Sequence, residues 1–314
     1  MRDAYALSWS EFAARYPDFT TIDGYRRMRY RIIRGEASPE EIGFDLVKPP
    51  PRRKFDLPPR LAIDSFFFFS DFHAPYHNVD LLTKALELRY RHHATITDCI
   101  IGGDLFNFES ISKHGIDFPH ASLEEEYEAI TSILTAIGMH FKRCWITLGN
   151  HDRRFSRRLD AAIRFQSLID GAIGKYEGAC EFIAVDHDYV LIDPEGDASD
   201  RRWIVGHPKT YSRIGGSTPI KIAQVHRRNV ICGHNHIIGV QCTPCGTYIG
   251  IDAGHMTDET RHHYSVTSMT AHPRWQAGFV VVDCGYPTLY SERHTDWKRA
   301  LSCATVRKRH KLKR

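Results

Sequence analysis

The chain has 314 residues, of which 42% are hydrophobic and 25% are charged, an ordinary composition for a soluble globular protein. No apolar run approaches the roughly eighteen residues that a membrane-spanning helix needs, which excludes a membrane-spanning protein. Charged residues interrupt the first nineteen positions, so the apolar core of a secretory signal is absent and we expect a cytoplasmic protein.

Basic residues gather at both ends of the chain, although the formal net charge is only +4. Five arginines lie between positions 26 and 34, and six of the eight residues from 307 to 314 are Lys or Arg. Such charge blocks are typical of solvated ends or of segments that attract polyanions. Five prolines between positions 48 and 59 predict an extended linker. We therefore expect a basic N-terminal segment with a linker (1–59), a main domain (60–300) and a basic tail (301–314).

From residue 60 onward, apolar runs of strand length alternate with amphipathic stretches, the pattern of an α/β sheet. We predict strands at 61–70, 98–102 and 143–148, separated or followed by helices at 80–92, 122–141 and 154–169. Further strands are expected at 182–185, 189–192, 203–205, 230–232, 247–251 and 279–283. The eight cysteines are interpreted as reduced, buried thiols, and the pair at 242 and 245 as part of a turn.

Polar residues that can bind a metal follow five of these predicted strands. The segments concerned are Asp71-Phe72-His73, Gly103-Asp104, Gly149-Asn150-His151, Gly206-His207 and Gly233-His234-Asn235-His236. Because the carboxyl ends of parallel strands lie along one edge of an open sheet, we expect all five to meet in one crevice. In extended backbone, the outer residues of D-x-H and H-x-H project to the same side, and the glycines leave room for a close ligand.

The set of candidate ligands is larger than one metal ion needs. Its members are Asp71, His73, Asp104, Asn150, His207, His234 and His236. Two ions that share one bridging carboxylate can use seven groups and still keep a position open for substrate. The mixture of carboxylate, amide and imidazole suits Mn, Fe, Zn or Ni better than Ca. The sequence therefore predicts a binuclear centre of two divalent metal ions.

The ordered blocks D-x-H, G-D-x-x, G-N-H-D, G-H and G-H-x-H resemble those of the calcineurin-like metallophosphoesterases, over about residues 62 to 285. The local sequence around the first block is most similar to that of phage-encoded or bacterial members. The resemblance implies an α/β fold in which a two-sheet β-sandwich is flanked by helices. It also implies ligand sets of Asp71, His73 and His236 for one metal and Asn150, His207 and His234 for the other, with Asp104 bridging and His151 as the catalytic histidine.

One position departs from the family pattern. Asn107 stands where many relatives carry Asp, so we place it outside the metal shell, as a group that contacts substrate. Arg154, on the helix after the third block, is a second candidate for substrate binding, because an arginine fork suits phosphate. We expect Asp152, or another nearby carboxylate, to orient His151 and raise its pKa. His255, after Gly254, and His262 have no comparable placement and are expected at the surface or behind the ligands.

The resulting hypothesis is a hydrolase that cleaves phosphodiester bonds of nucleic acid or nucleotides. A hydroxide between the two metals attacks phosphorus, and His151 acts as general acid. Two alternatives stay open: a phosphomonoesterase that acts on phosphoproteins or small molecules, and a nucleic-acid-binding protein without catalysis. The sequence leaves the physiological substrate, the native metals and the oligomeric state open.

Overall fold

A computed structural model describes residues 56–112, 120–158, 163–174, 176, 178–195, 201–262 and 275–302. The predicted basic segment at 26–34 and the tail from 303 onward lie outside this set, as does most of the predicted linker. Within the described ranges, we find no helix both long and apolar enough to span a bilayer.

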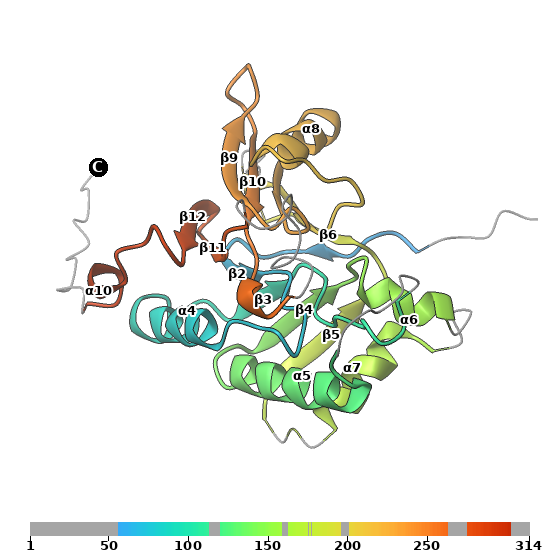
Figure 1. Cartoon of the computed structure of the whole chain (residues 1–314). Helices are drawn as coiled ribbons and strands as arrows, with labels where there is room; N and C mark the ends of the chain where they lie inside the picture. The colour runs from blue at the N-terminus through green and yellow to red at the C-terminus, as the bar shows by residue number, and fades with distance from the viewer. Residues whose placement is uncertain are drawn as a thin grey trace, which may run out of the picture. The chain divides into compact units, whose positions relative to one another are not determined.

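The fold is of the mixed α/β type, with two mixed sheets. The first sheet contains β12 (Tyr286–Ser291), β11 (Gly278–Asp283), β2 (Phe66–Phe69), β3 (Asp98–Ile101), β4 (Arg143–Thr147) and β5 (Glu181–Val185), in this spatial order. The second contains β1 (Arg60–Leu61), β6 (Tyr189–Ile192), β7 (Trp203–Gly206), β8 (Asn229–Cys232), β10 (Ile249–Ala253) and β9 (Ile238–Cys242). In the first sheet β2 to β5 are parallel, and in the second β7, β8 and β10 are parallel (Figure 1).

Strand β2 explains how the layers are held together. Its four consecutive phenylalanines are fully buried, and alternate side chains enter different cores. Phe67 and Phe69 pack with the apolar faces of the helices α4 (Val79–His92), α5 (Leu123–Gly138) and α7 (Phe165–Ile173). Phe66 and Phe68 pack with Trp203 of the second sheet. The two sheets therefore share one core, and the first sheet has a second core under its helices.

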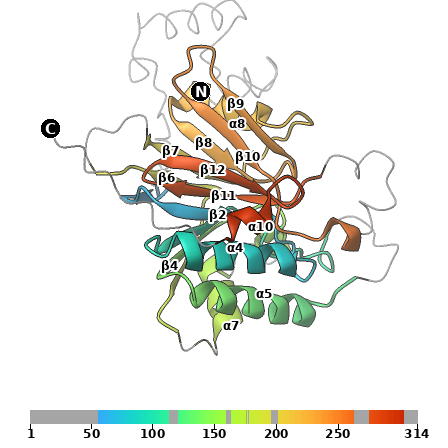
Figure 2. The ribbon, with the colours of Figure 1, turned by 90° about the vertical axis from the view of Figure 1, so that its left-hand side faces the viewer.

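Helix α8 (Ser217–His226) covers part of the second sheet. Its Ile220 and Ala223 pack with Ile204 and Val230 of β7 and β8. Figure 2 shows α4, α5 and α7 grouped together and α8 beside β9 and β10. Three short helices complete the described elements: α6 (Asp152–Arg158), η2 (Glu259–Arg261) and α10 (Trp297–Ala300). The predicted arrangement of two sheets flanked by helices is thus present.

Several predicted elements are wrong in detail. Residues 61–70 form two strands rather than one, β1 and β2, which lie in different sheets. The chain turns between them at Asp64 and Ser65. These two residues accept hydrogen bonds from the backbone N–H groups of Gly285 and Cys284, which follow β11. The predicted helix 154–169 is two helices, α6 and α7. Prediction missed β9 and β12 because each is an edge strand with exposed positions and little continuous apolar sequence.

The cysteine prediction holds only in part. Four of the seven cysteines in the described ranges are buried, whereas Cys242, Cys245 and Cys284 are exposed. Cys242 ends β9, and the chain turns from there into the antiparallel strand β10, as expected for a turn between two apolar runs.

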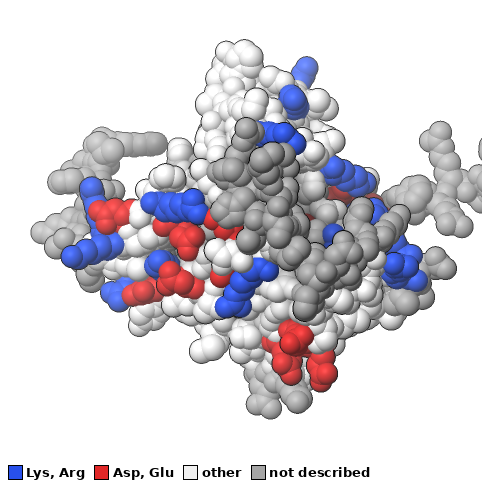
Figure 3. Space-filling model, viewed as in Figure 1, with Lys and Arg blue, Asp and Glu red and all other residues white. Residues whose placement is uncertain are grey.

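On the face shown in Figure 3, basic and acidic side chains are interspersed. On α4, Lys84 pairs with Asp80 and Arg91 with Glu87, each one helical turn away. Such exposed pairs neutralise one another and contribute little to stability.

Candidate metal centre

The five segments predicted to carry ligands come from both sheets, and the structure brings all seven candidate side chains together. Asp71, Asp104 and Asn150 follow β2, β3 and β4 of the first sheet, while His207 and His234 follow β7 and β8 of the second. The prediction that the five strand ends share the edge of one sheet is therefore wrong. The meeting point lies where the carboxyl ends of parallel strands from two packed sheets come side by side.

Unusual backbone conformations mark these loops. Five of the seven candidate ligands have a positive φ: Asp71 (56°), His73 (45°), Asp104 (51°), His234 (75°) and His236 (54°). Only a few per cent of non-glycine residues adopt this region, and they cluster at functional sites. The expected extended D-x-H and H-x-H geometry is therefore wrong, because both segments turn sharply at each ligand.

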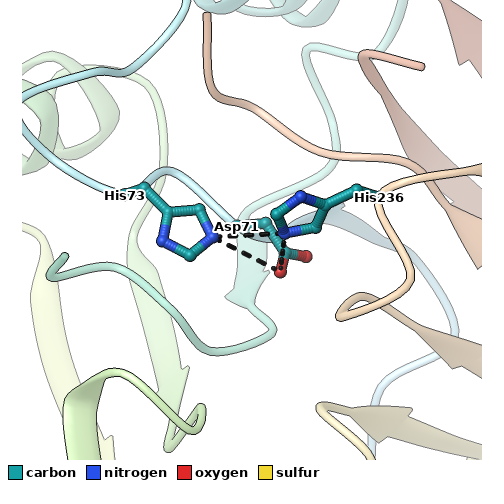
Figure 4. A group of neighbouring side chains, drawn as sticks. All are labelled: Asp71, His73 and His236. Carbon is teal, nitrogen blue, oxygen red and sulfur yellow. Dashed lines mark hydrogen bonds and ion pairs between the residues drawn. The ribbon is translucent and has the colours of Figure 1, made fainter. Parts of the chain in front are cut away.

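The first group consists of Asp71, His73 and His236 (Figure 4). His236 Nε2 lies 3.0 Å from Asp71 Oδ1 and 3.2 Å from His73 Nε2. Two ligands that each bind one ion at about 2.1 Å lie roughly 3.0–3.4 Å apart, for angles between octahedral and tetrahedral. Two imidazole nitrogens at this separation fit adjacent positions in the coordination shell of one cation.

The second group consists of Asp104, Asn150, His207 and His234. His207 Nε2 lies 3.3 Å from Asp104 Oδ2, 3.0 Å from Asn150 Oδ1 and 3.1 Å from His234 Nδ1. These four atoms converge from four different loops, and again two imidazole nitrogens face each other. The separations match a second set of ligands around one ion.

Asp104 connects the two groups. Its Oδ2 is 3.3 Å from His207 Nε2 and 3.8 Å from His73 Nε2, so one carboxylate reaches a histidine of each group. Its other oxygen, Oδ1, accepts a hydrogen bond of 2.8 Å from the backbone N–H of His151. The carboxylate is therefore held at a fixed orientation between the two groups.

Further hydrogen bonds orient the other ligands. Ser70 Oγ donates to Asp71 Oδ2 at 2.6 Å, and the N–H of His234 donates to the same oxygen at 2.9 Å. His207 Nδ1 lies 2.9 Å from the carbonyl oxygen of Gly102, which places the ring proton on Nδ1 and leaves Nε2 as the ligand atom. Outer partners of this kind fix the orientation of metal ligands.

Glycines make room for the carboxylates. A Cβ on Gly149 would lie 2.0 Å from Asp104 Oδ1, and one on Gly233 would lie 2.3 Å from Asp71 Oδ2. Any other residue at either position would displace a candidate ligand, which agrees with the predicted role of these glycines.

Buried charge in this cluster favours a cation. Burial by itself raises the pKa of Asp104, but the neighbouring His207 and His151 rings hold that pKa well below its usual range. Conversely, burial lowers the pKa of His207, and the Asp104 and Asp71 carboxylates outweigh this and raise it to about 10. Two buried carboxylates thus demand positive charge, which a proton on His207 supplies when no ion is bound. Metal binding would displace that proton.

His151 stands beside the cluster. Its Nδ1 lies 2.8 Å from the carbonyl oxygen of Asn107, and its Nε2 lies 3.0 Å from the Arg154 guanidinium. Burial lowers the pKa of His151 to about 4, despite the opposing effect of Asp104. The predicted net rise of this pKa is therefore wrong: the nearby carboxylate of Asp104 acts in the raising direction, but burial outweighs it. A backbone carbonyl, and not an acid, orients the ring.

Asp152 does not orient His151. Its buried carboxylate accepts hydrogen bonds from the backbone N–H groups of Asp104 (2.8 Å), Phe106 (3.0 Å) and Gly149 (2.8 Å). It therefore joins the loop after β3 to the loop after β4, and its role is to hold two ligand loops in register.

The two predicted substrate contacts lie next to His151. Arg154 donates to the carbonyl oxygen of Asn107 at 3.0 Å as well as contacting the His151 ring. The Asn107 side chain is buried and donates to Glu109 at 3.2 Å. This contact orients the side chain within its own loop, and its contact with substrate stays a prediction.

Three further side chains pack against the first group. They are Trp275, to which sequence analysis assigned no role, and His255 and His262, which it expected at the surface or behind the ligands. The rings of Trp275 and His255 lie 4.2 Å and 5.4 Å from the ring of His236, and His262 lies 5.4 Å from His73. His255 and His262 are almost fully buried. Only the Gly254-His255 pair at the end of β10 resembles the pattern of the other strand ends, so the sequence offered little to identify this cluster.

Comparisons with known proteins leave the family open. No family description matches the sequence, and no curated protein matches it. The solution NMR structure of Thermotoga maritima protein TM1076 aligns over 73% of this chain and 99% of its own length, with 11% identity and a TM-score of 0.32. A likeness at this TM-score is too loose to assign the fold.

Glu126 of α5 provides a test by pH. Its Oε2 accepts a hydrogen bond from Phe108 N–H, in the loop after Asp104, yet burial raises the pKa of Glu126 from 4.5 to about 7. Because the folded protein then holds this proton more tightly than the unfolded chain does, stability falls as pH rises from about 4.5 to 7. Glu126→Gln removes this loss. In urea unfolding, the free energy of unfolding of the variant should rise relative to that of the wild type by up to about 3 kcal/mol between pH 4.5 and 7. A constant difference between the two proteins would contradict the shifted pKa.

Proposed function

We propose that this protein is a binuclear metal-dependent phosphoesterase with the calcineurin-like metallophosphoesterase fold. The observation that carries the proposal is the position of Asp104, whose carboxylate reaches a histidine of each of two ligand groups. Two sets of donors around one shared carboxylate are the arrangement expected for two ions about 3.5–4 Å apart. The imidazole and oxygen donors favour Mn, Fe, Zn or Ni.

The residues at hand fit this chemistry. A pair of bound divalent cations lowers the pKa of water and neutralises negative charge on a phosphoryl group. Asp71, His73 and His236 would hold one ion, Asn150, His207 and His234 the other, and Asp104 both. Arg154 brings a fixed positive charge beside the His151 ring, where it suits a phosphoryl oxygen.

His151 is the candidate proton donor to the leaving oxygen. It is neutral at neutral pH in the substrate-free protein because burial lowers its pKa to about 4. A bound phosphate ester carries negative charge, which favours the protonated form of a neighbouring imidazole. Substrate binding thus favours the protonated ring. Because His151 Nδ1 is paired with the carbonyl oxygen of Asn107, Nε2 is the atom that would donate the proton.

Metal loading is the first test. Protein treated with EDTA and then given excess Mn²⁺ should bind about two ions per chain by elemental analysis. Ligands that bind only the folded state stabilise it, by about 2.7 kcal/mol at 100 times the dissociation constant. We therefore expect a clear rise in melting temperature on loading. Fewer than about one ion per chain, with no thermal shift, would favour the alternative of a protein without catalysis.

The class of ester is the second test. The loaded protein is assayed on bis-p-nitrophenyl phosphate and on p-nitrophenyl phosphate under the same conditions. The proposal of a phosphodiesterase for nucleic acid or nucleotides expects the diester to be cleaved with the larger kcat/KM. Preference for the monoester would favour the phosphomonoesterase instead.

A further inference from the structure

The loop between β7 and α8 places an exposed aromatic ring beside the metal centre. It runs from His207 to Gly216, and its exposed residues include Lys209, Tyr211 and Arg213. Tyr211 is 69% exposed. Its place next to the candidate ligand His234 makes this exposed ring available to a molecule bound at the metal centre.

Hydrogen bonds fix this loop to the ligand loop after β8. The N–H of Ser212 donates to Asn235 Oδ1 at 2.9 Å, and Asn235 stands between the ligands His234 and His236. Asn235 in turn donates to Asp252 Oδ1 at 2.7 Å, and Asp252 Oδ2 accepts from the N–H of Gly216 at 2.7 Å. Two points of the loop are therefore tied to the same frame as the ligands, so Tyr211 has a defined place relative to them.

Tyr211 lies on the side of the second ligand group. Its ring centroid is 6.3 Å from that of His234, with the planes 80° apart. Because the side chain is exposed despite this contact, the ring offers surface on which a planar group can stack. The sugar separates the base of a nucleotide from its phosphorus, so a base whose phosphate lies at the metal centre can reach a ring placed beside His234.

Net positive charge lies on the same loop and on α6, just after the Asn150-His151 segment. Arg153 Nη2 and Lys209 Nζ lie 3.0 Å and 3.6 Å from opposite oxygens of Asp188, so two cations share one carboxylate and one positive charge remains. Arg153 follows the Asn150-His151 segment, and Lys209 belongs to the loop of Tyr211. An anionic group of a substrate would be attracted here.

We propose that this loop is a nucleoside subsite, in which a base stacks on Tyr211 and an adjoining phosphate contacts Lys209 and Arg153. The inference rests on the proposed phosphoesterase function and names its substrate class: a phosphodiester with a nucleoside substituent. Stacking on an exposed aromatic ring together with cations along the backbone is a general mode of binding single-stranded nucleic acid and nucleotides.

The test compares two diesters with the same leaving group, thymidine 5′-(p-nitrophenyl phosphate) and methyl p-nitrophenyl phosphate. Tyr211→Ala should raise KM for the thymidine ester by roughly 5- to 150-fold, the range found for loss of base stacking. KM for the methyl ester should stay within about twofold, and Tyr211→Phe should retain wild-type values on both. Tyr90→Ala, which removes an equally exposed tyrosine from α4, is the matched control.

A binding measurement separates this inference from the proposed function. Calorimetry with thymidine 5′-monophosphate and with inorganic phosphate, on the Mn-loaded protein, should show that Tyr211→Ala weakens only the nucleotide. If the wild type cleaves neither ester, the proposed function fails, while calorimetry still reports on the subsite. If cleavage is normal and Tyr211→Ala affects both esters equally, or neither, the subsite is refuted alone.

Discussion

Asp104→Asn is expected to abolish most activity while the fold is retained. Asparagine keeps one oxygen, which can still accept the N–H of His151, but it lacks the charge and the second oxygen needed to serve both ligand groups. Loss of an outer partner of a metal ligand already costs 10–100-fold, so loss of a shared ligand should lower kcat/KM by more than about 100-fold. Elemental analysis should find one bound ion or none.

The matched control is Asp80→Asn, which changes an exposed carboxylate on α4 that pairs with Lys84. It should leave metal content, melting temperature and activity unchanged. An Asp104→Asn protein that still binds two ions and retains activity within tenfold of the wild type would refute the shared carboxylate, and the binuclear proposal with it.

His151→Gln is expected to lower kcat by about 10²–10⁴-fold on a dinucleotide, the usual contribution of a positioned proton donor. The loss should be much smaller on bis-p-nitrophenyl phosphate, since p-nitrophenolate leaves without a proton. Metal content and the stabilisation by Mn²⁺ should be unchanged, because this ring lies beside the ligands and its two nitrogens contact Asn107 and Arg154.

The control for this variant is His226→Gln, at an exposed position in the last turn of α8. A different outcome for His151→Gln is informative: the ring lies in a group with His73 and Asp104 that could itself hold an ion. A fall to one bound ion per chain, with equal losses on both substrates, would show a ligand rather than a proton donor.

Local patterns in the sequence predicted many of the strands. The strands β3, β4, β5, β6, β7 and β8 begin and end within a residue or so of the predicted ranges, because each is a short apolar run bounded by polar residues or glycine. The edge strands β9 and β12 were missed because almost all of their residues are exposed or half-buried, so they lack an apolar run. The division of 61–70 into two strands depends on contacts with Cys284 and Gly285, more than two hundred residues away.

Asp152 shows most clearly what the sequence alone does not predict. Its place next to His151 in the chain suggested a pair of catalytic groups. In three dimensions its carboxylate faces the other way and accepts backbone N–H groups from two loops. Adjacent residues in a sharply turning loop point to different partners, and nothing in a one-dimensional pattern reports which.

The amino-acid sequence by itself determined which side chains can act as ligands and that each follows a short apolar strand, because strand ends and residue types are local properties. Only the tertiary structure decided that these strands belong to two sheets, that left-handed turns aim the ligands, and that Asp104 reaches both groups. Each of these depends on packing between segments far apart in the chain, where burial and shared hydrogen bonds outweigh local preference.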